Sequence, residues 1–193
     1  LDGIVTTDMN YTEEAYSVVI QNDQKIVICG KSSFTNYFSE MALIRYNADG
    51  SLDNTFDSDG KIKTSLPGFR QWGSQVVLQE DGKIIVTGGI DKDNKVEGIL
   101  IRYNQNGSID KSFDSDGIVI SELGRSIALQ RDGKILVAGA NGPDIGLAKY
   151  YQNGMLDGNF GENGKAITSF SDGNDYVYSL ALQKDGKIVV AGF

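Results

Sequence analysis

Six aromatic or arginine side chains, in two segments of the chain, are the residues whose types could bind a ligand. They are Phe34, Tyr37, Phe38, Phe69, Arg70 and Trp72. Tyrosine, tryptophan and arginine are favoured at the energetic centres of interfaces, and planar aromatic rings also stack on sugar rings. The same side chains could instead fold back and fill gaps between neighbouring structural units. On the first interpretation the sequence predicts a binding surface for a protein or a glycan.

The residue types needed for common catalytic chemistry are scarce. The chain has no histidine and one cysteine, Cys29, so Ser-His-Asp and Cys-His nucleophiles are excluded, as are the usual zinc and copper ligands. Carboxylates are plentiful, with 26 aspartate and glutamate residues, but their spacing marks no pair apart from those in turns. The sequence therefore predicts no catalytic residue and a protein that is not an enzyme.

Acidic turns raise the question of a metal site. Residues 57–60 and 114–117 both read Asp-Ser-Asp-Gly, and hard cations such as calcium bind several carboxylates at once. Residues 91–95 resemble the start of a calcium loop, but Lys95 stands where a ligand is needed. Aspartate before glycine is also ordinary turn chemistry. We interpret these segments as structural turns and expect no metal and no cofactor.

These residues must be positioned by a stretch that the chain repeats four times. Its clearest copy is residues 126–139, and the other copies begin at Val18, Val76 and Leu180. Ile127 and Leu129 alternate with small or polar residues, which is the period of a strand with one buried face. Residues 131–133, Arg-Asp-Gly, are typical of a tight hairpin loop. The apolar run 135–137 then predicts a returning strand that is buried on both faces.

A second repeated block follows each of the first three hairpins and ends in another short strand. The blocks are residues 43–60, 100–117 and 147–164, and the short strands are 61–65, 118–121 and 165–169. Residues 2–6 match 116–120, so the chain is expected to open in such a strand. Each unit thus has four strands, here called a to d. Four antiparallel strands repeated about every 50 residues are typical of a β-propeller blade. A flat solenoid is the competing architecture.

The predicted fold is therefore all-β, with about 3.75 blades of four antiparallel strands that belong to a larger closed propeller. The chain is one repeat array over residues 1–193, with units at 2–58, 59–115 and 116–162 and a partial unit at 163–193. Because unpaired strand edges are seldom left exposed, we expect further blades from a longer chain or from a second copy.

Loop lengths distinguish the two rims of this array. The a–b and c–d turns share one rim and keep a nearly constant length, whereas the b–c and d–a loops share the other rim and vary. The expected b–c loops are 31–40, 90–97 and 141–144, and the expected d–a loops are 8–16, 66–73, 122–124 and 172–176. Variation confined to one rim is typical of a scaffold with a binding face. We call it the variable rim.

A basic residue in strand c and an aspartate eight residues later also repeat. The pairs are Arg45 and Asp53, Arg102 and Asp110, and Lys149 and Asp157. We interpret them as a repeated ion pair that supports the connection from strand c to strand d.

The patterns Leu-Gln-x-Asp-Gly-Lys-Ile and Arg-Tyr-Asn-x-x-Gly-Ser-Leu-Asp-x-x-Phe resemble the bacterial delta-sixty repeats over essentially the whole chain. The resemblance implies a β-propeller of unknown function in an exported or surface-attached bacterial protein. Some members resemble cargo of the secretion system of gliding bacteria. Gln24 departs from the pattern, because the other three hairpins have glycine at this turn position. Tyr151 and Gly161 depart from it in the third block.

Charge and hydropathy exclude two classes of partner. The net charge of −8 argues against nucleic acid, and no apolar run approaches the roughly 18 residues of a membrane helix. The resulting interpretation is a non-catalytic secreted or cell-surface scaffold that recognises a protein or glycan, as in adhesion, through loops on the variable rim. The alternatives are a carbohydrate-active hydrolase or lyase that uses carboxylates, and an exported cargo of a bacterial secretion system.

Overall fold

A computed structural model describes residues 3–35, 37–66, 70–92, 95–170 and 172–193. This part of the chain contains strands, turns and loops and no α-helix. The strands are β1 (Thr12–Ile20), β2 (Ile26–Thr35), β3 (Phe38–Tyr46), β4 (Lys61–Thr64), β5 (Arg70–Leu78), β6 (Ile84–Lys92), β7 (Lys95–Tyr103), β8 (Ile118–Ser121), β9 (Ser126–Leu129), β10 (Ile135–Asn141), β11 (Asp144–Tyr150), β12 (Lys165–Thr168), β13 (Val177–Leu182) and β14 (Ile188–Gly192). Among the described residues, none lies in a helix that could cross a membrane.

Strands that follow one another in the chain pair antiparallel within each unit. Unit 1 is β1–β4, unit 2 is β5–β8, unit 3 is β9–β12, and β13 and β14 form the hairpin of unit 4. One parallel bridge, Ser39 to Arg70, joins the sheets of units 1 and 2. The predicted all-β fold of four-stranded antiparallel units is confirmed.

The opening strand is missing. Residues 4–10 form no strand, although residues 2–6 match residues 116–120, which lead into β8. A d strand pairs with strand c of its own sheet, and the described part of unit 4 contains only strands a and b. The described strands therefore make three complete units and one hairpin.

The a–b hairpins keep one turn geometry in all four units. In unit 2 the N–H of Gly82 donates to the carbonyl of Gln79 at 2.9 Å, with φ of 80° at Gly82. In unit 1 Gln24 donates to the carbonyl of Gln21 at 2.9 Å with φ of 67°. Gln24 therefore adopts the left-handed conformation itself, at a cost on the order of 1 kcal/mol.

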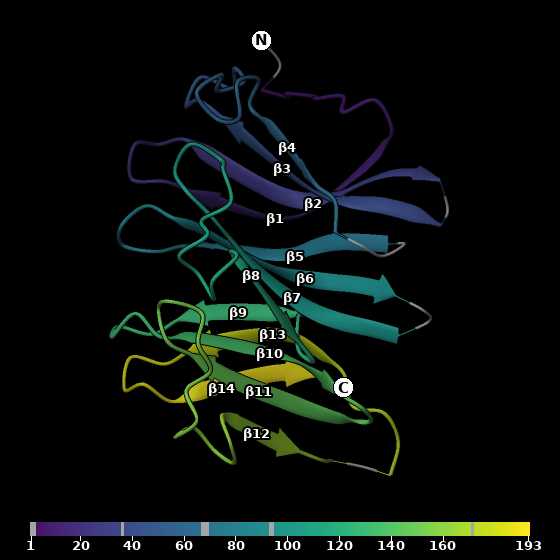
Figure 1. The fold of residues 1–193 in the computed structure, drawn as a ribbon, viewed down its shortest axis with the longest axis vertical. Helices are drawn as coiled ribbons and strands as arrows, with labels where there is room; N and C mark the ends of the chain where they lie inside the picture. The colour runs from purple at the N-terminus through teal and green to yellow at the C-terminus, as the bar shows by residue number, and fades with distance from the viewer. Residues whose placement is uncertain (1–2, 36, 67–69, 93–94, 171) are drawn as a thin grey trace.

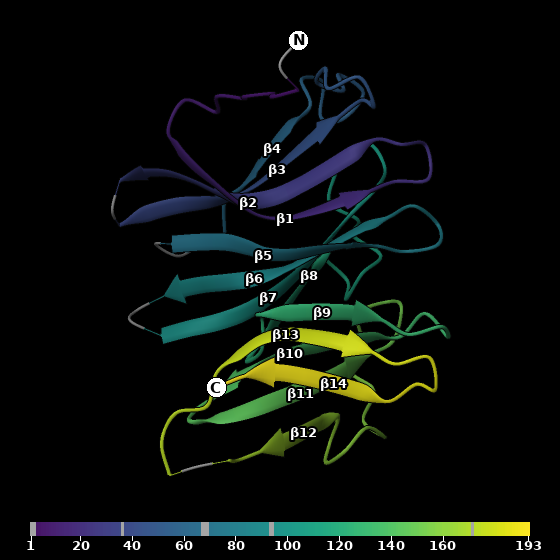
Figure 2. The same ribbon diagram turned by 180° about the vertical axis from the view of Figure 1, so that it is seen from behind.

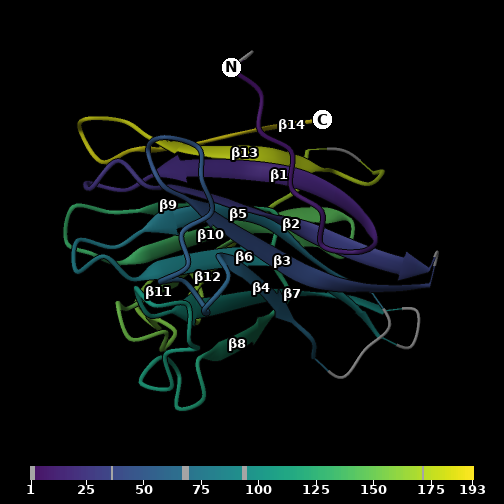
Figure 3. The same ribbon diagram turned by 90° about the horizontal axis from the view of Figure 1, so that it is seen from above.

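The units stack face to face, and the core consists of three apolar layers between them. Val27 and Leu43 of unit 1 pack against Val86 and Tyr103 of unit 2, and the same arrangement repeats between units 2 and 3 and between units 3 and 4. Units 1 to 3 follow one another along the long axis, and the hairpin β13–β14 lies beside unit 3 (Figures 1 and 2). Seen from above, β1 and β13 lie toward one side of the molecule and β8 toward the other (Figure 3).

A bulge in strand a is a feature that the alternating pattern did not predict. Its register with strand b shifts between Ala15 and Ser17, between Gly73 and Gln75, and between Val177 and Ser179. The extra residues are Tyr16, Ser74 and Tyr178, and Arg125 has the same place in unit 3. The facing residue in strand b is glycine. A Cβ at Gly88 would lie 1.9 Å from the carbonyl oxygen of Trp72. Bulges redirect side chains, often beside functional sites.

Candidate functional site

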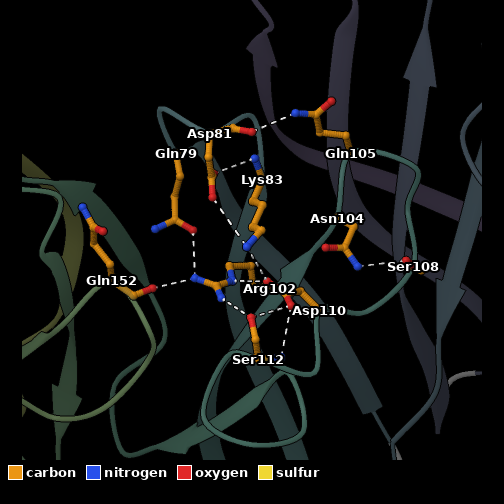
Figure 4. Close-up of polar contacts among 10 residues, drawn as sticks. All are labelled: Gln79, Asp81, Lys83, Arg102, Asn104, Gln105, Ser108, Asp110, Ser112 and Gln152. Carbon is orange, nitrogen blue, oxygen red and sulfur yellow. Dashed lines mark hydrogen bonds and ion pairs between the residues drawn. The ribbon is translucent and has the colours of Figure 1, made fainter.

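The repeated ion pair lies on the rim of constant-length turns (Figure 4). In unit 2 Nε of Arg102 donates to Oδ2 of Asp110 at 2.8 Å, and Nζ of Lys83 lies 3.1 Å from the same oxygen. Ser112 Oγ donates to Oδ1 of Asp110 at 2.7 Å. Burial acts to raise the pKa of Asp110, but the hydrogen bonds from Ser112 and the charges of Lys83 and Arg102 outweigh it and hold the pKa far below its usual range.

The third copy of this pair differs from the prediction. Asp53 pairs with Arg45 at 2.6 Å, as expected, but Asp157 pairs with Lys134 at 2.8 Å. The Nζ atom of Lys149 lies over the ring of Phe160, 4.4 Å from its centroid. A lysine has one compact ammonium group and lacks the planar fork with which arginine binds a carboxylate. Lys134, which follows the a–b turn of unit 3, therefore pairs with Asp157 in place of Lys149. These carboxylates are buried and fully paired, which makes them structural.

A groove at the variable rim, between units 2 and 3, is the candidate functional site. Its volume is about 460 Å³. It is lined by Trp72 and Ser74 of β5, Gly88 and Gly89 of β6, Lys95, Val96, Glu97 and Gly98 of β7, Glu122, Gly124 and Arg125 of the d–a loop, Gly139 and Ala140 of β10, and Gly142.

Glycines make this groove by allowing the two units to touch through their backbones. A Cβ on Gly124 would lie 1.9 Å from the carbonyl oxygen of Gly88, and one on Gly98 would lie 2.2 Å from the carbonyl oxygen of Leu123. A Cβ on Gly89 would lie 2.3 Å from Cζ2 of Trp72, so the indole packs directly on that backbone. The resulting groove has few side chains in its floor and one half-buried indole beside it.

Two carboxylates and two cations line the groove. Nζ of Lys95 lies 3.0 Å from Oε1 of Glu97, and Nζ of Lys165, outside the groove, lies 2.6 Å from Oε2 of Glu122. The hydrogen bond from Lys165 and its charge lower the pKa of Glu122, with a smaller contribution from the charge of Lys95. Glu122 is therefore a carboxylate at neutral pH.

Two further polar groups of the groove have no comparable partner. The Oγ atom of Ser74 is buried and forms no hydrogen bond in the structure. Within the described ranges, the guanidinium of Arg125 forms no ion pair, and it lies 5.6 Å from the ring centroid of Tyr178. A buried hydroxyl without a partner costs roughly 1–3 kcal/mol.

The residues predicted for binding do not form one site. Trp72 lines the groove, whereas Arg70 pairs with Asp91 on the surface. Phe34 stacks on Phe38, with ring centroids 5.6 Å apart, and Tyr37 is exposed beside them. Phe69 lies outside the described residues. Nothing in the structure tests a binding role for any of these six residues. That role stays a prediction.

The expected loops were also too long. β2 and β3 pair as far as Thr35 and Phe38, and β6 and β7 pair as far as Lys92 and Lys95. Phe34, Phe38, Arg70 and Trp72 therefore lie in strands. The remaining polar groove residues, Ser74, Glu97, Glu122 and Arg125, were not predicted. The signal for two of them was the glycine opposite each bulge, which recurs at Gly30, Gly88, Gly139 and Gly192.

Solved structures with a similar fold include enzymes. A gluconolactonase from Xanthomonas campestris is 10% identical with a TM-score of 0.55, and the match covers 98% of this chain and 58% of that one. A structural-genomics protein described as a gluconolactonase is 14% identical with a TM-score of 0.51, covering 92% and 57%. An inactive variant of virginiamycin B lyase from Staphylococcus aureus is 14% identical with a TM-score of 0.48, covering 96% and 51%. The chain thus spans little more than half of each solved protein. No curated protein matches it in sequence.

These comparisons correct the predicted function. The sequence was interpreted as a non-catalytic scaffold or recognition module and as a protein that is not an enzyme. The exclusion of an enzyme was wrong, because solved structures that share this fold include a gluconolactonase, so the fold itself gives no ground to exclude catalysis. The absence of histidine excludes particular catalytic groups and does not exclude catalysis.

A family model matches residues 21–56, 79–113 and 130–160, which is more than half of the chain. Each matched segment begins within the a–b hairpin and ends just after the aspartate of the repeated ion pair. The matched segments therefore contain the strands and contacts that recur from unit to unit. The chain belongs to the family described as a β-propeller domain of unknown function, DUF5122.

Proposed function

We propose that this chain carries the substrate groove of a carbohydrate-active propeller that hydrolyses a glycoside or lactone at the C1 carbon of a sugar. The groove between units 2 and 3 is the observation that carries the proposal. It combines a half-buried indole, the carboxylates of Glu97 and Glu122, and an unpartnered buried hydroxyl on Ser74. The two gluconolactonases of similar fold support the lactone as one substrate form.

Each group has a role that its chemistry allows. The indole of Trp72 is suited to stack on the apolar face of a sugar ring. Because no histidine is available, we assign the base that activates water to a carboxylate of the groove, Glu122, which Lys165 holds ionised. Glu97 is the second carboxylate, and hydrolysis at C1 commonly uses two.

Three wider expectations belong to this proposal. The repeat patterns support an assignment to the delta-sixty repeats, and with it a secreted or cell-surface location in a bacterium. Further blades complete the propeller, from a longer chain or a second copy.

The burial of strand a supports the expectation of further blades. Val18 is 60% exposed on the outer face of unit 1, whereas its counterparts Val76, Ile127 and Leu180, each covered by a preceding unit, are 3%, 1% and 6% exposed.

Hydrolysis of sugar lactones and of aryl glycosides by the purified chain tests the proposal. We expect turnover that falls on the order of 100-fold in E122Q and E97Q, as is typical when a general acid or base is removed. W72A should raise KM with a smaller effect on kcat. The matched control is E80Q, because Glu80 is exposed in an a–b turn on the opposite rim. Turnover that survives both groove carboxylate changes would contradict the assignment.

A further inference from the structure

We infer that the groove between units 2 and 3 takes a sugar that carries a carboxylate, and that Arg125 binds this acidic group. The inference rests on the proposed function, because it names the substrate class of the same groove. The charges that line the groove and the place of Arg125 in the repeat support it.

Arg125 is the cation of the groove that has no acidic partner among the residues that the structure describes. Lys95 is paired with Glu97 and Lys165 with Glu122, so their charges are already balanced. Arg125 has only the ring of Tyr178 beside it, with its Cζ atom 5.6 Å from the centroid. Aspartate and glutamate outnumber lysine and arginine by 26 to 18 in this chain, so a groove arginine without a carboxylate is notable.

The bulge explains why this side chain lies in the groove. Arg125 has the place of the extra residues Tyr16, Ser74 and Tyr178, which strand a redirects out of its regular alternation. Arg125 and Ser74 both line the groove, one from each of the two neighbouring units. Arg125 is the exposed cation that the bulge of unit 3 adds to this groove, and the Oγ of Ser74 is buried behind the lining on the side of unit 2. A carboxylate accepts two parallel hydrogen bonds from a guanidinium, which makes it the anion that an unpaired arginine binds best.

The charges favour a short sugar that binds through one carboxylate over a polyanion. Glu97 and Glu122 are already paired with Lys95 and Lys165, which, among the described lining residues, leaves the single charge of Arg125 to be balanced by a ligand. When one carboxylate of the sugar is bound by Arg125, its ring is free to stack on Trp72. Its C1 carbon is then free to meet Glu97 and Glu122. Charge recognition at one end and stacking at the other would fix the orientation of the ring.

Binding of two matched probes tests the inference, namely digalacturonate and its carboxyl-reduced counterpart, digalactose. We expect the wild-type chain to bind digalacturonate on the order of tenfold more tightly, as measured by calorimetry, because hydrogen bonds to a charged group are worth about that factor. R125Q should abolish the difference between the probes, and R125K should restore part of it. R131Q is the control, because Arg131 is exposed in an a–b turn on the other rim.

The outcomes separate this inference from the proposed function. A preference for digalacturonate that disappears in R125Q supports the inference even if no hydrolysis is found. An equal affinity for both probes, or a preference that R125Q leaves unchanged, overturns it, although hydrolysis of neutral sugars could still stand. Loss of affinity for both probes in R125Q would also overturn it, because that pattern marks Arg125 as a structural support of Tyr178. Failure of the wild-type chain to bind either probe overturns the inference as well.

Discussion

The hydroxyl of Ser126 in unit 3 accepts a hydrogen bond from the backbone N–H of Leu180 in unit 4, with 2.9 Å between Oγ and N. The residue at this place in each earlier unit does the same for the next one. Ser17 Oγ accepts from the N–H of Val76 at 3.3 Å, and Gln75 Oε1 accepts from the N–H of Ile127 at 2.9 Å. Neighbouring a strands, whose backbones do not pair in a ladder, are thus linked by one side chain per unit.

Removing this hydroxyl should destabilise the stack. S126A leaves the buried N–H of Leu180 without its acceptor and Gln75 without the proton donated by Ser126 Oγ at 2.8 Å. We expect the free energy of unfolding to fall by about 1–3 kcal/mol, measured by urea denaturation. The control S108A removes a hydroxyl from an exposed turn and should change stability by less than about 0.5 kcal/mol. Equal effects of the two substitutions would argue against the link.

The ion pair of unit 2 should dominate stability at its rim. D110N leaves the buried guanidinium of Arg102 without a negative partner, and we expect a loss of about 3–5 kcal/mol in the same denaturation experiment. The double variant D110N/R102M tests the cause. It should recover part of the loss, because the unpaired charge is then gone. A double variant less stable than D110N would contradict this explanation.

The same aspartates predict how stability depends on pH. The pKa values of Asp53 and Asp110 are lower in the folded chain than the ordinary value of about 3.9 in an unfolded chain. Their contribution is therefore fully present above about pH 5 and is lost as the pH falls toward their folded pKa values. Urea midpoints between pH 7 and pH 3 should fall for the wild-type chain and fall less for D110N. Parallel curves for the two proteins would contradict the prediction.

Cys29 should be unreactive until the chain unfolds. Burial raises the pKa of its thiol to about 12, and its Sγ donates to the carbonyl of Gly73 at 3.6 Å. Because the thiolate is the reactive form, we expect negligible modification by a thiol reagent at pH 8 and complete modification in concentrated urea. Stoichiometric labelling of the native chain within minutes would show that this part of the core opens readily.

A side chain added at a groove glycine should cost stability. A Cβ at Gly124 meets the carbonyl of Gly88, so G124A must push units 2 and 3 apart, with an expected loss of about 1–3 kcal/mol or more. Gly158 has nothing within 4 Å of such a Cβ, which makes G158A the matched control. Thermal denaturation of both variants provides the comparison, and a neutral G124A would show that the backbones are not in contact.

The outer face of unit 1 should bind another blade. Because Val18 and its neighbours have the pattern of a covered face, we expect the 193-residue chain to associate in solution, as measured by light scattering. V18K should weaken association about tenfold or more, since it buries a charge without a partner. V5K changes an exposed valine outside the strands and should have no such effect. A monomer at all concentrations would contradict self-association.

The parts that the sequence could predict are those determined by residues close together in the chain. Alternation and Asp-Gly turns predicted the hairpins, and a spacing of eight residues predicted the pair of Arg45 and Asp53. The ion pair of Asp157 was missed, because a pattern of residue types does not say whether Lys134 or Lys149 reaches it. The groove was missed because Ser74 and Arg125 belong to different units and depend on bulges, which shift the register by one residue. Among the residues predicted for binding, Trp72 lines the groove from a strand and not from a loop, and its binding role stays a prediction.

The ion pairs have a consequence for the order in which the chain can fold during synthesis. Arg102 reaches beyond its own unit and donates through Nη1 to the carbonyl of Gln152 in the next unit at 2.6 Å, and Arg45 donates in the same way to the carbonyl of Gln105. An arginine buried at the rim of one unit thus has its carboxylate partner within the unit but lacks this carbonyl acceptor until the following block has left the ribosome. The hydrogen-bond set of each of these arginines is therefore completed only after the block of the next unit has been made.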